Sequence, residues 1–82
     1  MADDLEQRIL AMLHARAATS TICPSDVARE ASPEDWRPLM DPVRDAARRL
    51  VAAGRVEITQ HGEVVDLDQA KGPIRIRLPR RT

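Results

Sequence analysis

The hydrophobic pattern of the chain changes its period at Gly54, and this change limits the folds open to it. Before Gly54, apolar residues recur every three to four positions, which is the spacing of one face of an α-helix. After Gly54, Val56 and Ile58 alternate with polar residues, which is the pattern of a half-buried strand. The sequence therefore predicts helices before residue 54 and strands after it.

The helical part divides into three segments. A first helix is predicted over residues 3–18, where Leu5 and Ile9 begin an apolar stripe at helical spacing. A Thr-Ser-Thr run breaks this helix, and Ile22 can form a very short strand before the next proline. A second helix is predicted over residues 24–31, because proline suits the first position of a helix.

A third helix is predicted to begin near Trp36 and to end at Gly54. Pro38 and Pro42 offer no amide hydrogen, so the start cannot be fully regular and a separate first turn can precede the helix. The run that follows Pro42 is strongly helical. Its predicted buried stripe consists of aliphatic residues: Leu39, Val43, Ala46, Ala47, Leu50 and Val51.

A hairpin is predicted beyond the third helix. The pair at 61–62, His-Gly, can turn the chain, a short pairing can follow at 64–65, and residues 66–72 form a polar loop. In the last strand, alternation points apolar residues to one face and two arginines to the other. These two sets are Ile74, Ile76 and Leu78 on the first face, and Arg75 and Arg77 on the second.

The composition indicates one small soluble domain. Eighty-two residues leave no room for a second domain, and no signal peptide or membrane span is expected. A single cysteine, Cys23, cannot form an intrachain disulfide, which fits a reducing cytoplasm. The expected location is therefore cytoplasmic.

The order helix, strand, helix, helix, strand, strand is that of a winged helix-turn-helix domain of the α+β class. Three helices form the core, a C-terminal β-hairpin forms the wing, and the first strand is minimal. The predicted domain covers residues 1–82, of which 79–82 form a basic tail.

Three segments together resemble a known family: CPSDVAR at 23–29, WRPLMDPVRDAARRL at 36–50 and KGPIRIRL at 71–78. It is a small bacterial domain family of unknown function with a winged-helix fold. The resemblance covers the chain from Leu5 to Leu78 and implies that fold in a bacterial cytoplasm. It implies no catalytic or binding residues.

Basic residues suggest a nucleic-acid partner. The last dozen residues carry five positive charges and no acid, although the formal net charge of the whole chain is zero. In a winged helix the third helix can read the major groove while the wing and tail contact phosphates or the minor groove. The predicted function is therefore binding of double-stranded DNA, as in a transcriptional regulator. The candidate residues are Arg37, Arg44, Arg48, Arg49, Lys71, Arg75, Arg77, Arg80 and Arg81.

The alternative is a protein-interaction module, with an unknown protein or a second copy of the chain as partner. Asp41 and Asp45 stand three and four residues before arginines of the third helix, where local ion pairs form. A continuous positive surface from this helix to the wing would favour DNA. Interruption by these acids and by Glu57 would favour a protein.

Other chemistry has weaker support in the sequence. Cys23 precedes the second helix, where a thiol can become reactive, but small buried or capping cysteines are more common and no second cysteine is present. His14 and His61 have no partner at metal-ligand spacing, and no phosphate-binding glycine loop occurs. We therefore expect no metal, cofactor, small-molecule substrate or enzymatic activity. Trp36 is interpreted as a core anchor or, alternatively, as a contact residue.

Overall fold

The computed structural model describes residues 2–16 and 20–79. Within these residues the chain forms three α-helices, one 3-10 helix and a four-stranded antiparallel sheet, which confirms the α+β class. The helices are α1 (Ala2–His14), α2 (Pro24–Ala31) and α3 (Met40–Ala52), with the 3-10 helix η1 (Arg37–Leu39) directly before α3. The strands are β1 (Thr21–Ile22), β2 (Glu57–Gln60), β3 (Glu63–Val64) and β4 (Arg75–Arg77).

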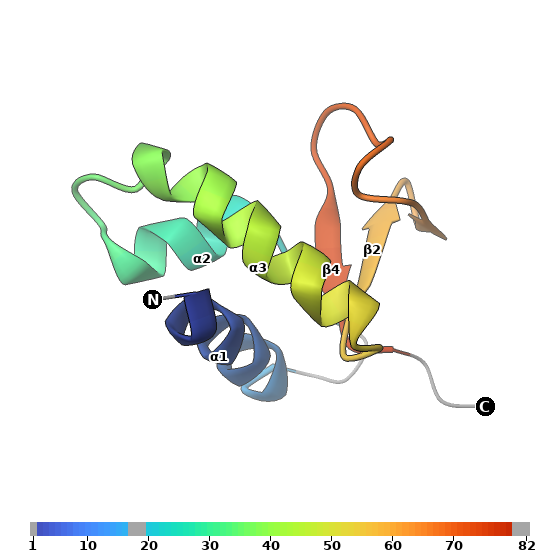
Figure 1. Cartoon of the computed structure of the whole chain (residues 1–82), viewed down its shortest axis with the longest axis horizontal. Coiled ribbons are helices and arrows are strands. Elements are labelled where there is room, and N and C mark those ends of the chain that lie inside the picture. The colour runs from blue at the N-terminus through green and yellow to red at the C-terminus, as the bar shows by residue number, and fades with distance from the viewer. Residues whose placement is uncertain (1, 17–19, 80–82) are drawn as a thin grey trace.

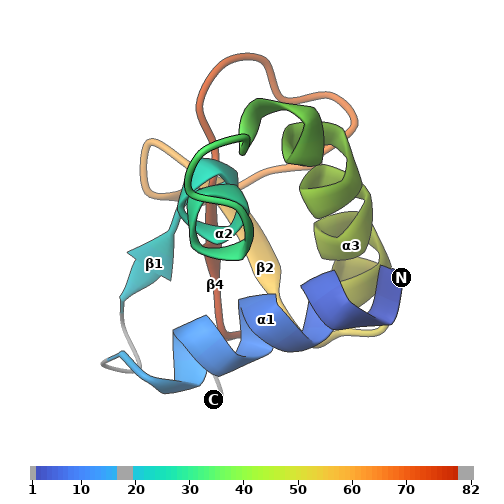
Figure 2. The ribbon, with the colours of Figure 1, turned by 90° about the vertical axis from the view of Figure 1, so that its left-hand side faces the viewer.

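The helices and the sheet enclose one aliphatic core. In Figure 1 the helices occupy one side of the molecule and the strands β2 and β4 the other, and in Figure 2 α2 lies in front of the strands between α1 and α3. Helix α3 packs against both other helices. None of the described helices is long and apolar enough to cross a membrane. The buried core residues include Ile9, Leu13, Ile22, Val27, Val43, Ala46, Leu50, Ile58, Ile74 and Ile76.

Helix α1 is shorter than the predicted segment 3–18. It ends at His14, and the amide of Arg16 then donates to the carbonyl oxygen of Leu13 at 3.2 Å. This contact spans three residues, so the chain tightens after the helix and does not continue it. Of the remaining predicted helical positions, 17–18 lie outside the described residues.

Helix α2 occupies the predicted residues 24–31. Pro24 begins it, and Cys23 is its N-cap, with the backbone amide of Cys23 donating to Asp26 Oδ2 at 2.9 Å. Val27 and Ala28 are fully buried. The proline and the reciprocal cap explain why this short segment is helical, because an isolated helix of eight residues is only marginally stable in water.

The predicted separate turn before the third helix is confirmed as η1. At its other end α3 stops as expected, because Gly54 has a positive φ of 73° and Arg55 donates its amide to the carbonyl oxygen of Leu50 at 2.8 Å. The prediction of the buried stripe is wrong for one residue. Val51 is 40% exposed, because it lies one residue past Leu50 and therefore about 100° further around the helix.

The sheet differs from the predicted two-stranded hairpin plus a minimal strand. Its order is β1-β4-β2-β3, so a third C-terminal strand, β3, lies at one edge and β4 lies inside the sheet. Register explains the central place of β4, since Ile76 pairs with Ile22 on one side and with Ile58 on the other. All three isoleucines are essentially buried. The turn at His61 and Gly62, with φ of 54° and 83°, joins β2 to β3 as a tight hairpin.

The β3–β4 loop, residues 65–74, is held against the rest of the fold. Leu67 is 5% exposed, so the segment predicted to be a polar loop contributes to the core. Gln60 Nε2 donates to the carbonyl oxygens of Lys71 and Pro73, at 2.5 and 3.1 Å. Asp66 Oδ1 accepts the amide of Asp68 at 2.9 Å, which stabilises the turn. In Figure 1 this loop projects from the end of the sheet opposite the C-terminus.

Candidate nucleic-acid interface

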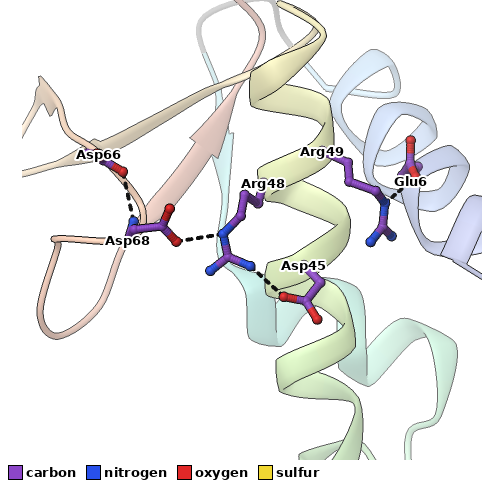
Figure 3. Close-up of polar contacts among 6 residues, drawn as sticks. All are labelled: Glu6, Asp45, Arg48, Arg49, Asp66 and Asp68. Atoms are coloured by element: carbon purple, nitrogen blue, oxygen red, sulfur yellow. Dashed lines mark hydrogen bonds and ion pairs between the residues drawn. The ribbon is translucent and has the colours of Figure 1, made fainter.

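Three arginines lie in η1 and on one side of α3. Arg44 and Arg48 are four residues apart, about one turn, so they lie on the same side of α3, and Arg37 lies in the 3-10 turn η1 that precedes this helix. We call them the arginine stripe. Arg48 Nε donates to Asp68 Oδ1 at 2.6 Å, so the Arg48 end of the stripe contacts the β3–β4 loop (Figure 3).

Arg48 is held between two carboxylates. Besides Asp68, it contacts Asp45, whose Oδ1 accepts Arg48 Nη1 at 2.5 Å. The hydrogen bonds to Asp68 and then to Asp45 raise the pKa of Arg48 above its ordinary value, although desolvation opposes this rise. Arg48 therefore stays charged, and these two acids offset its charge. Asp41, one turn before Asp45, is also exposed, so an acidic line flanks the arginine stripe.

Arg37 and Arg44 are the members of the stripe without an ion pair among the described residues. Arg37 is exposed and Arg44 is half-buried. Their guanidinium groups can therefore offer several N–H donors to a ligand without first leaving a carboxylate. The available positive charge of α3 lies in the part of the helix nearest η1.

Arg49 does not join the arginine stripe. Its Nε donates to Glu6 Oε2 of α1 at 2.8 Å, on the side of α3 away from the β3–β4 loop (Figure 3). There it lines an open groove of about 550 Å³ between the three helices. The other groove residues are Asp4, Leu5, Arg8, Ala31, Leu39, Pro42 and Asp45.

The two arginines of β4, here called the sheet arginines, occupy a different surface. Ile76 between them faces the core, so Arg75 and Arg77 lie on the sheet face away from the helices. Arg77 Nη2 lies 2.9 Å from Glu57 Oε1 on the neighbouring strand, and the Arg77 side chain is only 15% exposed. The predicted footprint of helix and strand arginines is thus divided between two faces.

Arg75 reaches across the sheet towards β1. Its Nε donates to Thr21 Oγ1 at 2.8 Å and its Nη1 to Cys23 Sγ at 2.7 Å. Cys23 is half-buried at the start of α2. These contacts tie three elements together and occupy much of the hydrogen-bonding capacity of this guanidinium group.

The β3–β4 loop carries one cation and two acids, and one of these acids, Asp68, contacts Arg48 of α3. Lys71 is exposed and has no ion pair among the described residues. Asp66 and Asp68 are exposed in the same loop, and Glu63 precedes it. Lys71 is therefore a single positive point within a negative segment. The other predicted contacts, Arg80 and Arg81, lie outside the described residues.

A basic and aromatic cluster was not predicted from the sequence. Arg29, in the last turn of α2, and Arg37 both lie over the ring of Trp36. Because Trp36 and Arg37 are adjacent in the sequence, their contact could have been predicted. Arg29 comes from another helix, and no spacing rule connects it to Trp36.

The remaining candidate chemistry is sparse. His14 and His61 are both exposed. In the part of the chain that the structure describes, no three histidine, cysteine, aspartate or glutamate side chains are placed to hold a metal ion.

The model of a family described as a protein of unknown function (DUF3253) matches residues 2–79 of the chain. This match covers nearly the whole sequence, and the chain therefore belongs to that family. No curated protein matches it at a significant level.

Proposed function

We propose that this member of the DUF3253 family is a non-catalytic winged-helix domain that binds double-stranded DNA. In this assignment α2 and α3 form the helix-turn-helix, and α3 enters the major groove. The β2–β3 hairpin and the β3–β4 loop form the wing beside it. A regulator of transcription in a bacterial cytoplasm is the role that fits this activity.

The arginine stripe is the observation that carries the proposal. It gathers one guanidinium group of η1 and two on one side of α3, and two of the three have no ion pair among the described residues. An arginine in the major groove can donate two hydrogen bonds to guanine O6 and N7. Lys71 in the adjacent loop suits a phosphate of the same duplex.

The bracing of the β3–β4 loop supports the same proposal. Leu67 is buried, Gln60 bonds the loop backbone, and Asp68 contacts Arg48. A loop that is ordered before binding loses less conformational entropy when it meets a ligand. The loop and α3 can therefore contact one duplex as a preformed pair.

Fluorescence anisotropy with a labelled duplex of mixed sequence tests the proposal across a salt series. If four to six phosphates are contacted, the slope of log affinity against log salt should be about −3.6 to −5.4. Absence of binding at low salt would contradict the proposal. A salt-sensitive affinity without any sequence preference would support backbone contact and contradict base reading by α3.

A protein-interaction module is the second candidate, and the ion pairs favour it. Arg48, Arg49 and Arg77 each contact a carboxylate of the same chain, and Asp41 and Asp45 flank the stripe. A surface of mixed sign suits a protein partner better than a phosphate backbone. Sedimentation velocity tests the case in which the partner is a second copy, because a homodimer would double the sedimenting mass at high concentration.

A further inference from the structure

Trp36, the only aromatic residue of the chain, holds two arginines from different elements. The guanidinium carbon of Arg29 lies 4.5 Å from the ring centroid, and that of Arg37 lies 5.3 Å from it. Both distances are within the range of a cation–π interaction. Two positive charges are thus gathered at one ring, between the end of α2 and the start of η1.

The charges of this cluster are open to solvent and lack acidic partners. Arg29 and Arg37 are exposed, and neither forms an ion pair among the described residues. Glu30 directly follows Arg29, but its carboxylate pairs with Arg8 at 3.3 Å. Glu34 and Asp35 are exposed, and neither approaches Arg29 or Arg37 within ion-pair distance. The contacts with the indole ring thus leave both guanidinium groups free to bind an anion.

The ring itself has a fixed position. Trp36 is half-buried and packs against the core, and its carbonyl oxygen accepts the amide of Leu39 at 2.9 Å. An arginine held over a packed ring has lost part of its side-chain entropy before any ligand arrives. The cluster is therefore ordered in advance for a ligand that bonds to guanidinium N–H groups.

The geometry points to a phosphate clamp: we propose that Arg29, Trp36 and Arg37 bind a backbone phosphate of the nucleic acid. Planar guanidinium groups bond phosphate oxygens in pairs, and among the described residues no carboxylate forms an ion pair with Arg29 or Arg37. Two guanidinium groups already lie over the indole ring, which makes base stacking on it unfavourable. This inference rests on the proposed DNA binding and adds Arg29 and Trp36 to its contact surface.

The position of the clamp fits that surface. Arg37 belongs both to the clamp and to the arginine stripe, so the clamp continues the stripe beyond the start of α3. Arg44 and Arg48 would then face the major groove of the DNA, while the clamp would contact the DNA backbone that borders this groove. Phosphate contacts of this kind fix the register of a protein on the duplex and carry no sequence information.

Anisotropy with the labelled duplex tests the clamp through Arg29→Gln, because Arg29 has no other part in the proposed interface. We expect Arg29→Gln to weaken binding about fivefold and to reduce the steepness of the salt slope by about 0.9. Arg16→Gln is the matched control, since Arg16 is an exposed arginine after α1 and its loss removes the same charge. It should change the affinity by less than about twofold.

Substitutions of the ring test its positioning role. Trp36→Phe retains a π face and should bind DNA nearly as the wild type does. Trp36→Leu should approach the affinity of Arg29→Gln, and adding Arg29→Gln to Trp36→Leu should cause little further loss. Thermal unfolding followed by circular dichroism identifies the temperature at which each variant is folded, so that affinities are compared between folded proteins.

Duplexes with single neutral methylphosphonate linkages identify the phosphate. One linkage should weaken wild-type binding and have no further effect on Arg29→Gln. If wild type binds, Arg44→Gln weakens binding and Arg29→Gln behaves like Arg16→Gln, the clamp is wrong and the proposed function stands. If wild type does not bind the duplex at low salt, the proposed function fails and the clamp fails with it. An affinity loss at Arg29→Gln with an unchanged salt slope would also contradict the clamp.

Discussion

The arginine stripe on η1 and α3 and the sheet arginines on β4 have the same chemistry but different surroundings. Arg37 and Arg44 have no ion pair among the described residues, whereas Arg77 pairs with Glu57 and Arg75 donates to Thr21 and Cys23. The basic residues of β4 therefore serve the architecture of the fold. Net charge along a segment therefore does not measure the charge that a ligand can reach.

The comparison also concerns the apolar residues between these arginines. Ile76 lies between the sheet arginines and is fully buried. The residues between the arginines of α3 belong to a helix that has one face open to solvent. Strand β4 is held by pairing with a strand on each side, whereas α3 is held by the buried apolar residues of one face. Substitutions in β4 should therefore act on stability, and those in the stripe should act on binding.

The largest effect should come from Ile76→Ala. Ile76 is fully buried between β1 and β2, so we expect a loss of about 2–5 kcal/mol in the free energy of unfolding, measured by urea denaturation. Val64→Ala is the control, because Val64 on the edge strand is 58% exposed and should change stability by less than about 0.5 kcal/mol. Similar losses for the two variants would contradict the central place of β4.

Among the binding measurements, Arg44→Gln should have the largest effect. If the stripe reads a base, this variant should lose about 1–3 kcal/mol of binding free energy in the anisotropy assay and relax the preference at one base pair. Arg75→Gln should change DNA affinity much less, because that side chain is bonded to β1 and to Cys23. Equal losses for the two variants would show that only overall charge matters.

The pair of Arg77 and Glu57 should give an intermediate effect. A double-mutant cycle with Arg77→Gln and Glu57→Gln should measure a coupling of about 1 kcal/mol in the free energy of unfolding. The pair is partly shielded, with side-chain exposures of 15% and 30%, so high salt should reduce this coupling only in part. A coupling near zero would mean that Arg77 is as available to ligands as the stripe.

The smallest effect should come from Asp68→Asn. Removing this carboxylate frees Arg48 from one of its two acids, so DNA affinity should rise about twofold to threefold in the same assay. Glu6→Gln removes an equal charge beside Arg49, on the other side of α3, and should raise the affinity less. A loss of affinity on Asp68→Asn would indicate that its contact with Arg48 is needed to hold the loop in place.

Local patterns predicted the elements of the fold well. The proline at 24, the prolines around η1, the glycine at 54 and the His-Gly turn at 61–62 each fix a few backbone angles, and each boundary they indicate is present. The alternation in the last strand correctly placed Ile74 and Ile76 in the core. These features depend only on residues close together in the chain.

Contacts between distant residues could not be read in the same way. The pairing of β1 with β4 and the separate edge strand β3 depend on register, which no local pattern encodes. Leu67 looked like part of a polar loop because its neighbours are polar, yet it is buried. The candidate interface shows the same limit: charge and spacing indicated Arg44 and Arg48, but not that Arg49 turns towards α1 or that Arg29 reaches Trp36.

The interior position of β4 affects how the chain reaches its folded state. Strands β1 and β2 do not pair with each other, and both depend on a segment that is synthesised after them. Until residues 75–77 are in place, β1 and the inner side of β2 present unpaired hydrogen-bonding edges, which are sites for association between chains. Closing these distant contacts slows folding. A nascent or truncated form that ends before β4 should therefore be prone to aggregate. In the complete sheet, β4 covers these edges and protects the domain from such association.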